Sequence, residues 1–261
     1  MKERHADTCA VIFHQANKRF IEIRKSMLVN QITRDAERIA KSFDALHDLE
    51  KVSTQFAQSF GVLTSGILKA TDEGDDLRIA CGELLSNSLN SIAAAAYMLR
   101  GGFVLQPGPV IRSAIESMAV ALHLMQFQTD LQKHREHKFD STRAIASAKR
   151  VFPPFGQLYG FLSKEFTHIG RLYKQFTPIC EYTSSYEPLG LNLQFITSGV
   201  WMCYVTCELV FFDVVAHPRY WSEVPTEAQD HTPYCYDPSE EEKSWMAEFF
   251  GIENSSLDGA G

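Results

Sequence analysis

Apolar residues recur every three or four positions over most of the chain, which is the spacing of one face of an amphipathic helix. Between residues 16 and 68 the positions that carry this pattern include Phe20, Ile23, Met27, Val29, Ile32, Ile39, Phe43, Leu46 and Leu49. These spacings do not fit the strict alternation of a half-buried strand. The pattern therefore predicts helix through this N-terminal segment.

The same periodicity, interrupted by turn signals, predicts further helices along the chain. An acidic turn at residues 71–76 precedes the next helix, and paired glycines with two prolines at 100–109 end it. The predicted helices after the first segment cover residues 77–99, 110–126, 129–152, 155–169 and 189–216. His217-Pro218 ends the last of them, because the residue before a proline is disfavoured in helical conformation.

No segment long enough for a β-sheet is predicted, so the expected fold is an all-α multi-helix bundle with a C-terminal acidic tail. Residues 1–70 form N-terminal amphipathic helices, either within the bundle or as a separate helical hairpin. Residues 71–221 form the bundle core, and residues 222–261 form a partly flexible acidic tail. The tail keeps apolar residues spaced for a small docking helix: Trp245, Phe249, Phe250 and Ile252.

Composition and charge narrow the classes of function. The 261 residues are 45% apolar and 22% charged, which excludes a disordered chain. The net charge of −7 is concentrated in the tail, where residues 222–261 carry ten Asp or Glu against the single Lys243. Residues 130–174, in contrast, carry nine Lys or Arg against four Asp or Glu. Nucleic-acid-binding domains usually show a stronger basic bias. We therefore interpret the basic stretch as a solvated helix face and do not favour RNA as the partner.

The cysteines and the most apolar segment bear on localisation. The six cysteines form no C-x-x-C motif and no zinc-binding spacing, which favours free buried thiols. No secretory signal follows the charged N-terminus. The apolar segment at 189–216 contains Asn192, Gln194, Glu208 and Asp213, so it is interpreted as a core helix with no membrane role. The predicted compartment is the cytoplasm.

The helix predicted at 110–126 carries the first candidate for chemistry. On a helical wheel Arg112, Glu116, Ala119 and His123 share one narrow stripe, and the rest of the helix is apolar or small. This stripe either meets solvent, as on an ordinary bundle helix, or lines a polar cleft. In the second case Arg112 would bind an anion and Glu116 or His123 would move a proton.

A second candidate lies at residues 162–168, where Lys164 and His168 share the polar side of the helix and Ser163 lies nearby. His168 is suited to act as a general base or a metal ligand, although such a histidine is more often a hydrogen-bonded structural residue. Glu165 and His168 form a single Glu-x-x-His pair with no second copy, and no H-E-x-x-H motif is present. No metal and no cofactor are predicted.

The stretch from Leu99 to Glu116, with its Gly-Phe and Arg-Ser-x-x-Glu elements, resembles a poorly characterised family of bacterial all-α proteins. These proteins, catalogued as a domain of unknown function, carry a later helix with Leu-Ser and a His, as at Leu162 to His168. The resemblance covers roughly residues 77–215 and implies that Arg112, Glu116 and His168 lie near one another.

The chain is also distantly similar to HEPN bundles, many of which are toxin or defence ribonucleases. Those carry an Arg followed four to six residues later by a His on one helix. No arginine of this chain has such a histidine, which counts against the nuclease interpretation.

Three functions are compatible with these residues, and whether the protein is an enzyme stays open. The favoured hypothesis is a bundle that binds a protein partner or a small anionic ligand through a polar cleft; a homodimer is compatible with it. The ligand-binding candidates are Arg112, His123, Ser163 and Lys164, and the catalytic candidates are Arg112, Glu116 and His168. The alternative is a metal-independent HEPN-like ribonuclease of a toxin or phage-defence system, with His168 as base and Arg112 stabilising phosphate charge. A metal hydrolase using Glu116, His123 and His168 is the third.

Overall fold

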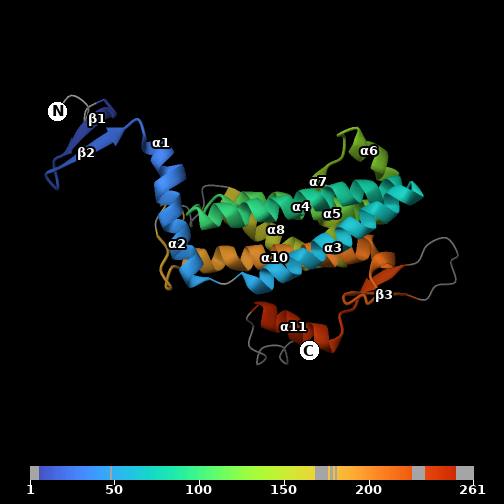
Figure 1. Cartoon of the computed structure of the whole chain (residues 1–261). Helices are drawn as coiled ribbons and strands as arrows, with labels where there is room; N and C mark the ends of the chain where they lie inside the picture. Colours follow the sequence, from blue (N-terminus) through green and yellow to red (C-terminus); the bar gives the residue numbers. More distant parts are fainter. Residues whose placement is uncertain are drawn as a thin grey trace.

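A bundle of long helices dominates the fold (Figure 1). The structure is a computed structural model that describes residues 6–47, 49–167, 176, 179, 181–224 and 233–250. The long helices of the bundle are α3 (Glu50–Glu73), α4 (Asp76–Arg100), α5 (Pro107–Gln126) and α10 (Glu187–Val210). They contact one another and enclose a continuous apolar core. The predicted multi-helix, mainly α fold is confirmed.

The turn predicted at residues 71–76 is present between α3 and α4. Gly74 ends α3 with a φ of 69°, a left-handed conformation that glycine adopts without steric cost. Asp75 then caps α4, since its side chain accepts a hydrogen bond of 3.0 Å from the backbone N–H of Arg78. The short connection places α3 and α4 as antiparallel neighbours.

The Pro-Gly-Pro segment opens α5, which begins three residues earlier than predicted because proline is tolerated in a first helical turn. Gly108 lies directly beneath the ring of Phe166, and a Cβ at this position would be 2.3 Å from that ring. Only a glycine allows this approach. It brings the π-helical turn η3 (Ser163–Thr167) against the start of α5.

The helix α10 runs through the centre of the core, as predicted for this apolar segment. Among the described residues it is the one helix long and apolar enough to cross a membrane, and 72% of its most apolar window is buried inside the bundle. Val200, Cys203 and Val205 have no exposed surface, and the buried Asn192 donates hydrogen bonds to backbone carbonyls of Val104 and Pro188. Its apolar surface is thus covered by neighbouring helices.

The helix predicted at 129–152 is wrong as a single element. The chain forms the short pieces η2 (Gln128–Asp130), α6 (Leu131–Arg135) and α7 (Ser141–Val151). His137 adopts a positive φ of 55° between the pieces, and Asp140 accepts a hydrogen bond from the backbone of Thr142 to start α7. The helix α8 (Pro154–Leu162) follows and continues into η3.

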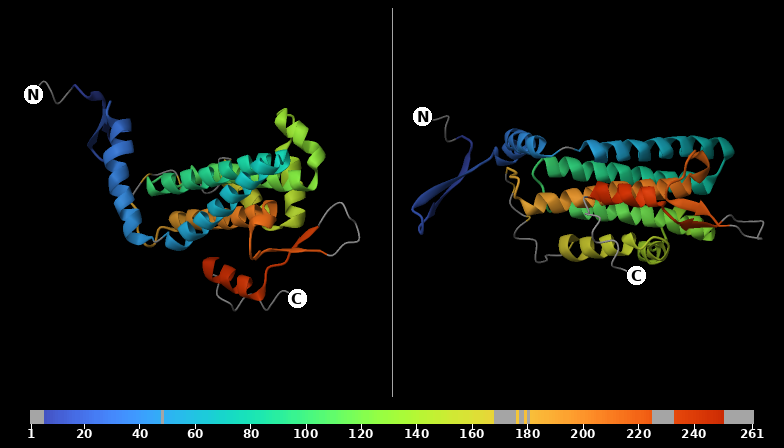
Figure 2. Two further views of the ribbon diagram at one scale, coloured as in Figure 1. Left: turned by 45° about the vertical axis from the view of Figure 1, so that its right-hand side comes forward. Right: turned by 90° about the horizontal axis from the view of Figure 1, so that it is seen from below.

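The helix predicted from residue 16 is wrong at its start. Strands β1 (Thr8–His14) and β2 (Arg19–Arg24) form an antiparallel hairpin, with Lys18 at a φ of 52° in the turn. Aromatic and β-branched residues pair across it, as in Ile12 with Ile21 and Phe13 with Phe20. The chain then becomes helical in α1 (Met27–Asn30), η1 (Gln31–Asp35) and α2 (Ala36–Leu46). Figures 1 and 2 show the hairpin standing beyond the end of the bundle.

The C-terminal segment folds back onto the bundle. Strand β3 (Trp221–Glu223) pairs with β4 (Tyr234–Tyr236), and α11 (Glu240–Phe250) lies against α10 (Figure 1). Trp245 and Phe249 of α11 pack against the core, whereas Ile252 lies outside the described residues. Part of the acidic segment therefore forms the small docking helix that its apolar spacing indicated.

Candidate functional site

Arg112 of α5 lies at the centre of a compact polar cluster between α5, α8 and η3. Its Nε donates a hydrogen bond of 2.9 Å to the hydroxyl of Ser163, and its Nη2 donates one of 2.7 Å to the hydroxyl of Tyr159. Its Nη2 also forms an ion pair of 2.8 Å with Glu116, one helical turn further along α5. The Tyr159 hydroxyl in turn donates to Glu116 over 3.1 Å.

The charges in this cluster stabilise the contacts that Arg112 makes with its neighbouring side chains. The hydrogen bond to Tyr159 raises the pKa of Arg112, and the charge of Glu116 contributes in the same direction while burial opposes it. Arg112 and Glu116 are each about a quarter exposed, and the guanidinium lies 4.9 Å from the centre of the Tyr159 ring. The partners of Arg112 are thus supplied by the protein itself, and they fasten α8 and η3 onto α5.

The structure brings together part of the predicted set. Arg112, Glu116 and Ser163 meet in the cluster. Lys164 is 83% exposed and faces Glu165 at 3.8 Å, with no contact to Arg112. His168 lies outside the described residues, so its place in the predicted catalytic set stays a prediction.

His123 belongs to a different network from Arg112, although both are on α5. It is buried, with Nδ1 at 2.7 Å from the hydroxyl of Ser147 and Nε2 at 3.0 Å from Asp130. The buried carboxylate of Asp130 also accepts a hydrogen bond of 2.6 Å from Lys133. Lys133 and His123 lower the pKa of Asp130 to about 2, against the opposing effect of burial. This is a satisfied structural histidine, and the polar stripe expected to join it to Arg112 is interrupted by the fully buried Ala119.

Sequence reasoning missed a third polar group, which is assembled from α10, the chain after it, and α11. The buried Glu208 accepts backbone hydrogen bonds of 2.8 Å from Arg219 and 2.6 Å from Tyr220. Burial raises the pKa of Glu208, and these backbone donors oppose that rise. Glu242 of α11 accepts a hydrogen bond from the Tyr220 hydroxyl and faces Arg219 at 3.6 Å. No local sequence signal identifies this group, because its members come from three separate parts of the chain.

The N-terminal arm, which we define as residues 8–35, is the most unusual surface of the molecule. Nine of its large apolar side chains are between 48% and 74% exposed. They are Val11, Ile12, Phe13, Phe20, Ile21, Met27, Leu28, Val29 and Ile32. Exposed apolar residues scattered singly are ordinary, but nine within one short segment are unusual for a folded protein.

The described part of the chain contains no group of three or more His, Cys, Asp or Glu arranged to hold a metal ion. The described cysteines are all free, but the prediction of buried thiols holds only for Cys81, Cys203 and Cys207, since Cys9 and Cys235 are exposed. Burial raises the pKa of the Cys81 thiol to about 12. No protein-family model, no curated protein and no solved structure matches this chain. The candidate sites therefore rest on their own geometry.

Proposed function

We propose that this protein is a protein-binding scaffold in which the helical bundle presents the N-terminal arm for docking onto a second copy of the chain. The exposed apolar surface of the arm is the observation that supports this function. A two-stranded hairpin is marginally stable by itself in water. Full burial of a large apolar side chain contributes roughly 1.5–3 kcal/mol, so covering several of these nine would stabilise both the arm and the complex.

The edge of β1 indicates how the second copy docks. Among the described residues the N-terminal sheet has only two strands, which leaves one edge of β1 without a strand partner. The sequence of β1 from Thr8 to His14 contains no Lys, Arg, Asp, Glu or Pro. Natural sheets usually protect exposed edges with such residues. The edge of β2 carries this protection, with Arg19, Glu22 and Arg24.

Antiparallel pairing of β1 with β1 of a second copy would join the two hairpins into a four-stranded sheet. Such pairing is compatible with a twofold axis, because each strand presents the same edge to the other. Main-chain hydrogen bonds would supply affinity, and the apolar side chains of the two arms would cover one another. The arm projects past the end of the bundle, so the helices leave this edge accessible (Figure 2).

The oligomeric mass in solution tests this proposal. We expect a dimer by light scattering coupled to size-exclusion chromatography, and Ile12→Lys should convert it to a monomer with an unchanged helical circular dichroism spectrum. Leu68→Lys is the matched control, because Leu68 is a similarly exposed leucine on α3 of the bundle. It should leave the dimer intact. A monomeric wild-type protein, or a dimer that Ile12→Lys leaves unchanged, would contradict the proposal.

A further inference from the structure

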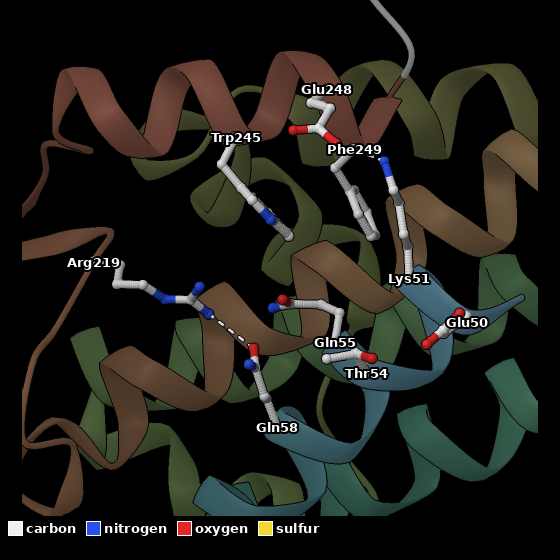
Figure 3. A pocket seen from close by; sticks show the side chains of 9 residues that line it. All are labelled: Glu50, Lys51, Thr54, Gln55, Gln58, Arg219, Trp245, Glu248 and Phe249. Atoms are coloured by element: carbon white, nitrogen blue, oxygen red, sulfur yellow. Dashed lines mark hydrogen bonds and ion pairs between the residues drawn. The ribbon is translucent and has the colours of Figure 1, made fainter.

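A pocket of about 410 Å³ lies between α3 and α11, far from the Arg112 cluster in the sequence and built by different elements (Figure 3). One side is polar and comes from α3, with Thr54, Gln55 and Gln58. The opposite side comes from α11 and carries Trp245 and Phe249. Volumes of about 300–1,000 Å³ are typical of pockets for small ligands.

Gln55 supplies the strongest sign that this pocket is a binding site. Its side chain is 98% buried, and its amide nitrogen Nε2 has no hydrogen-bond partner within the described ranges. A buried donor without an acceptor destabilises a protein, and such groups are rare in native structures. Figure 3 shows this amide on the pocket side of α3, facing toward Arg219 and Trp245. An acceptor brought by a ligand would satisfy it.

Arg219 adds a positive charge at the same end of the pocket. Its Nη2 donates to Gln58 over 3.3 Å, and its Nη1 lies 3.6 Å from Glu242, so both contacts are long for a guanidinium. The guanidinium lies 4.3 Å from the centre of the Tyr204 ring, and the side chain is 28% exposed. It is positioned to donate to an anion as well.

The other residues that line the pocket indicate which kind of ligand it fits. The rings of Trp245 and Phe249 stack on each other with their centres 4.8 Å apart and an angle of 20°, and the guanidinium of Arg219 lies 5.7 Å from the centre of the Trp245 ring. Lys51 and Glu248 pair with each other at 2.7 Å. Glu50 lies at the end of the pocket away from Arg219 (Figure 3). The positive charge of Arg219 and the stacked aromatic pair are thus adjacent.

We infer that this pocket binds a small aromatic carboxylate. The carboxylate oxygens accept hydrogen bonds from Nε2 of Gln55 and from the guanidinium of Arg219, since an ionised carboxylate only accepts. The ring of the ligand lies against the edges of the stacked Trp245 and Phe249 rings, where edge-to-face contact is favourable. This site is independent of the N-terminal arm, so failure of either proposal leaves the other standing.

A matched pair of probes separates the carboxylate from the ring. Indole-3-acetate and its neutral amide, indole-3-acetamide, are titrated into the full chain and followed by saturation-transfer NMR and calorimetry. The acid should bind saturably and at least about tenfold more tightly than the amide, because hydrogen bonds to a charged group are the stronger ones. Equal affinity for the two probes, or no saturable binding of the acid, would overturn the inference.

Variants at Gln55 locate the binding. Gln55→Leu should weaken binding of the acid about tenfold or more while the protein remains folded, since the change also removes an unsatisfied buried donor. Gln132→Leu, at an exposed glutamine on α6, is the control and should leave the affinity unchanged. Gln55→Glu keeps the shape of the side chain and places a like charge against the ligand, so it should abolish binding of the acid more than of the amide. Unchanged binding of the acid in both Gln55 variants would exclude this pocket.

Discussion

The helix α10 and the N-terminal arm contain similar apolar residues in opposite surroundings. Val200 and Val205 of α10 have no exposed surface, whereas Val11 and Ile12 of β1 are 59% and 49% exposed. In α10 this surface is covered by α3, α4 and α5. In the arm the described part of the chain leaves it uncovered. Apolar side chains thus stabilise the bundle where α10 is covered, whereas those of the N-terminal arm remain exposed.

The largest difference in stability between the two regions is expected when a charge is introduced into each. Val205→Asp places a carboxylate in the core without a partner, and we expect a loss of about 3–5 kcal/mol or more in the free energy of unfolding. Val11→Asp is the same substitution in the arm and should change the stability of the bundle by less than about 1 kcal/mol. Urea denaturation at a protein concentration low enough to favour monomers measures both. Equal losses in the two variants would show that the arm is packed in solution.

A smaller change in stability is expected when a partly buried polar side chain is compared with an exposed one. Arg112→Ala removes the clamp on Tyr159 and Glu116, and we expect a loss of roughly 1–3 kcal/mol because these half-buried groups lose their partner. Lys164→Ala, at an exposed position on η3, should stay within about 0.5 kcal/mol of wild type.

Thermal denaturation of both variants, together with a ribonuclease assay, also tests the HEPN-like alternative. That alternative requires RNA cleavage by the wild-type protein and its loss in Arg112→Ala at unchanged stability. Destabilisation of Arg112→Ala without any cleavage by the wild type would identify a structural clamp.

The smallest effect concerns Asp130, a buried carboxylate whose partners are all polar. Its pKa is lowered from 3.8 to about 2, so the charged form is stabilised in the folded state. The contribution of this group to stability is therefore fully present above about pH 4 and is lost as the pH falls toward 2. Denaturation of the wild type and of Asp130→Asn across this range should show the difference between them shrinking. A difference that is constant with pH would exclude the ionised carboxylate as its source.

Elements whose signals are local could be predicted from the amino-acid order alone. The three- and four-residue periodicity, the acidic turn before α4 and the prolines at the start of α5 are read from neighbouring residues, and they predicted α4, α5 and α10. The same periodicity was wrong for residues 16–24, because short apolar runs fit a helix and a strand equally and pairing across the hairpin decided between them. Arg112 and Glu116, four apart on one helix, could be paired from spacing alone.

The tertiary structure decided which of these residues share a site. Tyr159 reaches Arg112 across 47 residues, and Lys51 of α3 meets Glu248 of α11 across 197. Arg112 binds partners on α8 and η3, whereas His123 of the same helix binds Ser147 and Asp130, so the packing separates two residues that the wheel had joined. Side chains separated widely in the sequence meet only through helix packing, and burial depends on what covers a residue. Both are properties of the assembled bundle, which local periodicity does not encode.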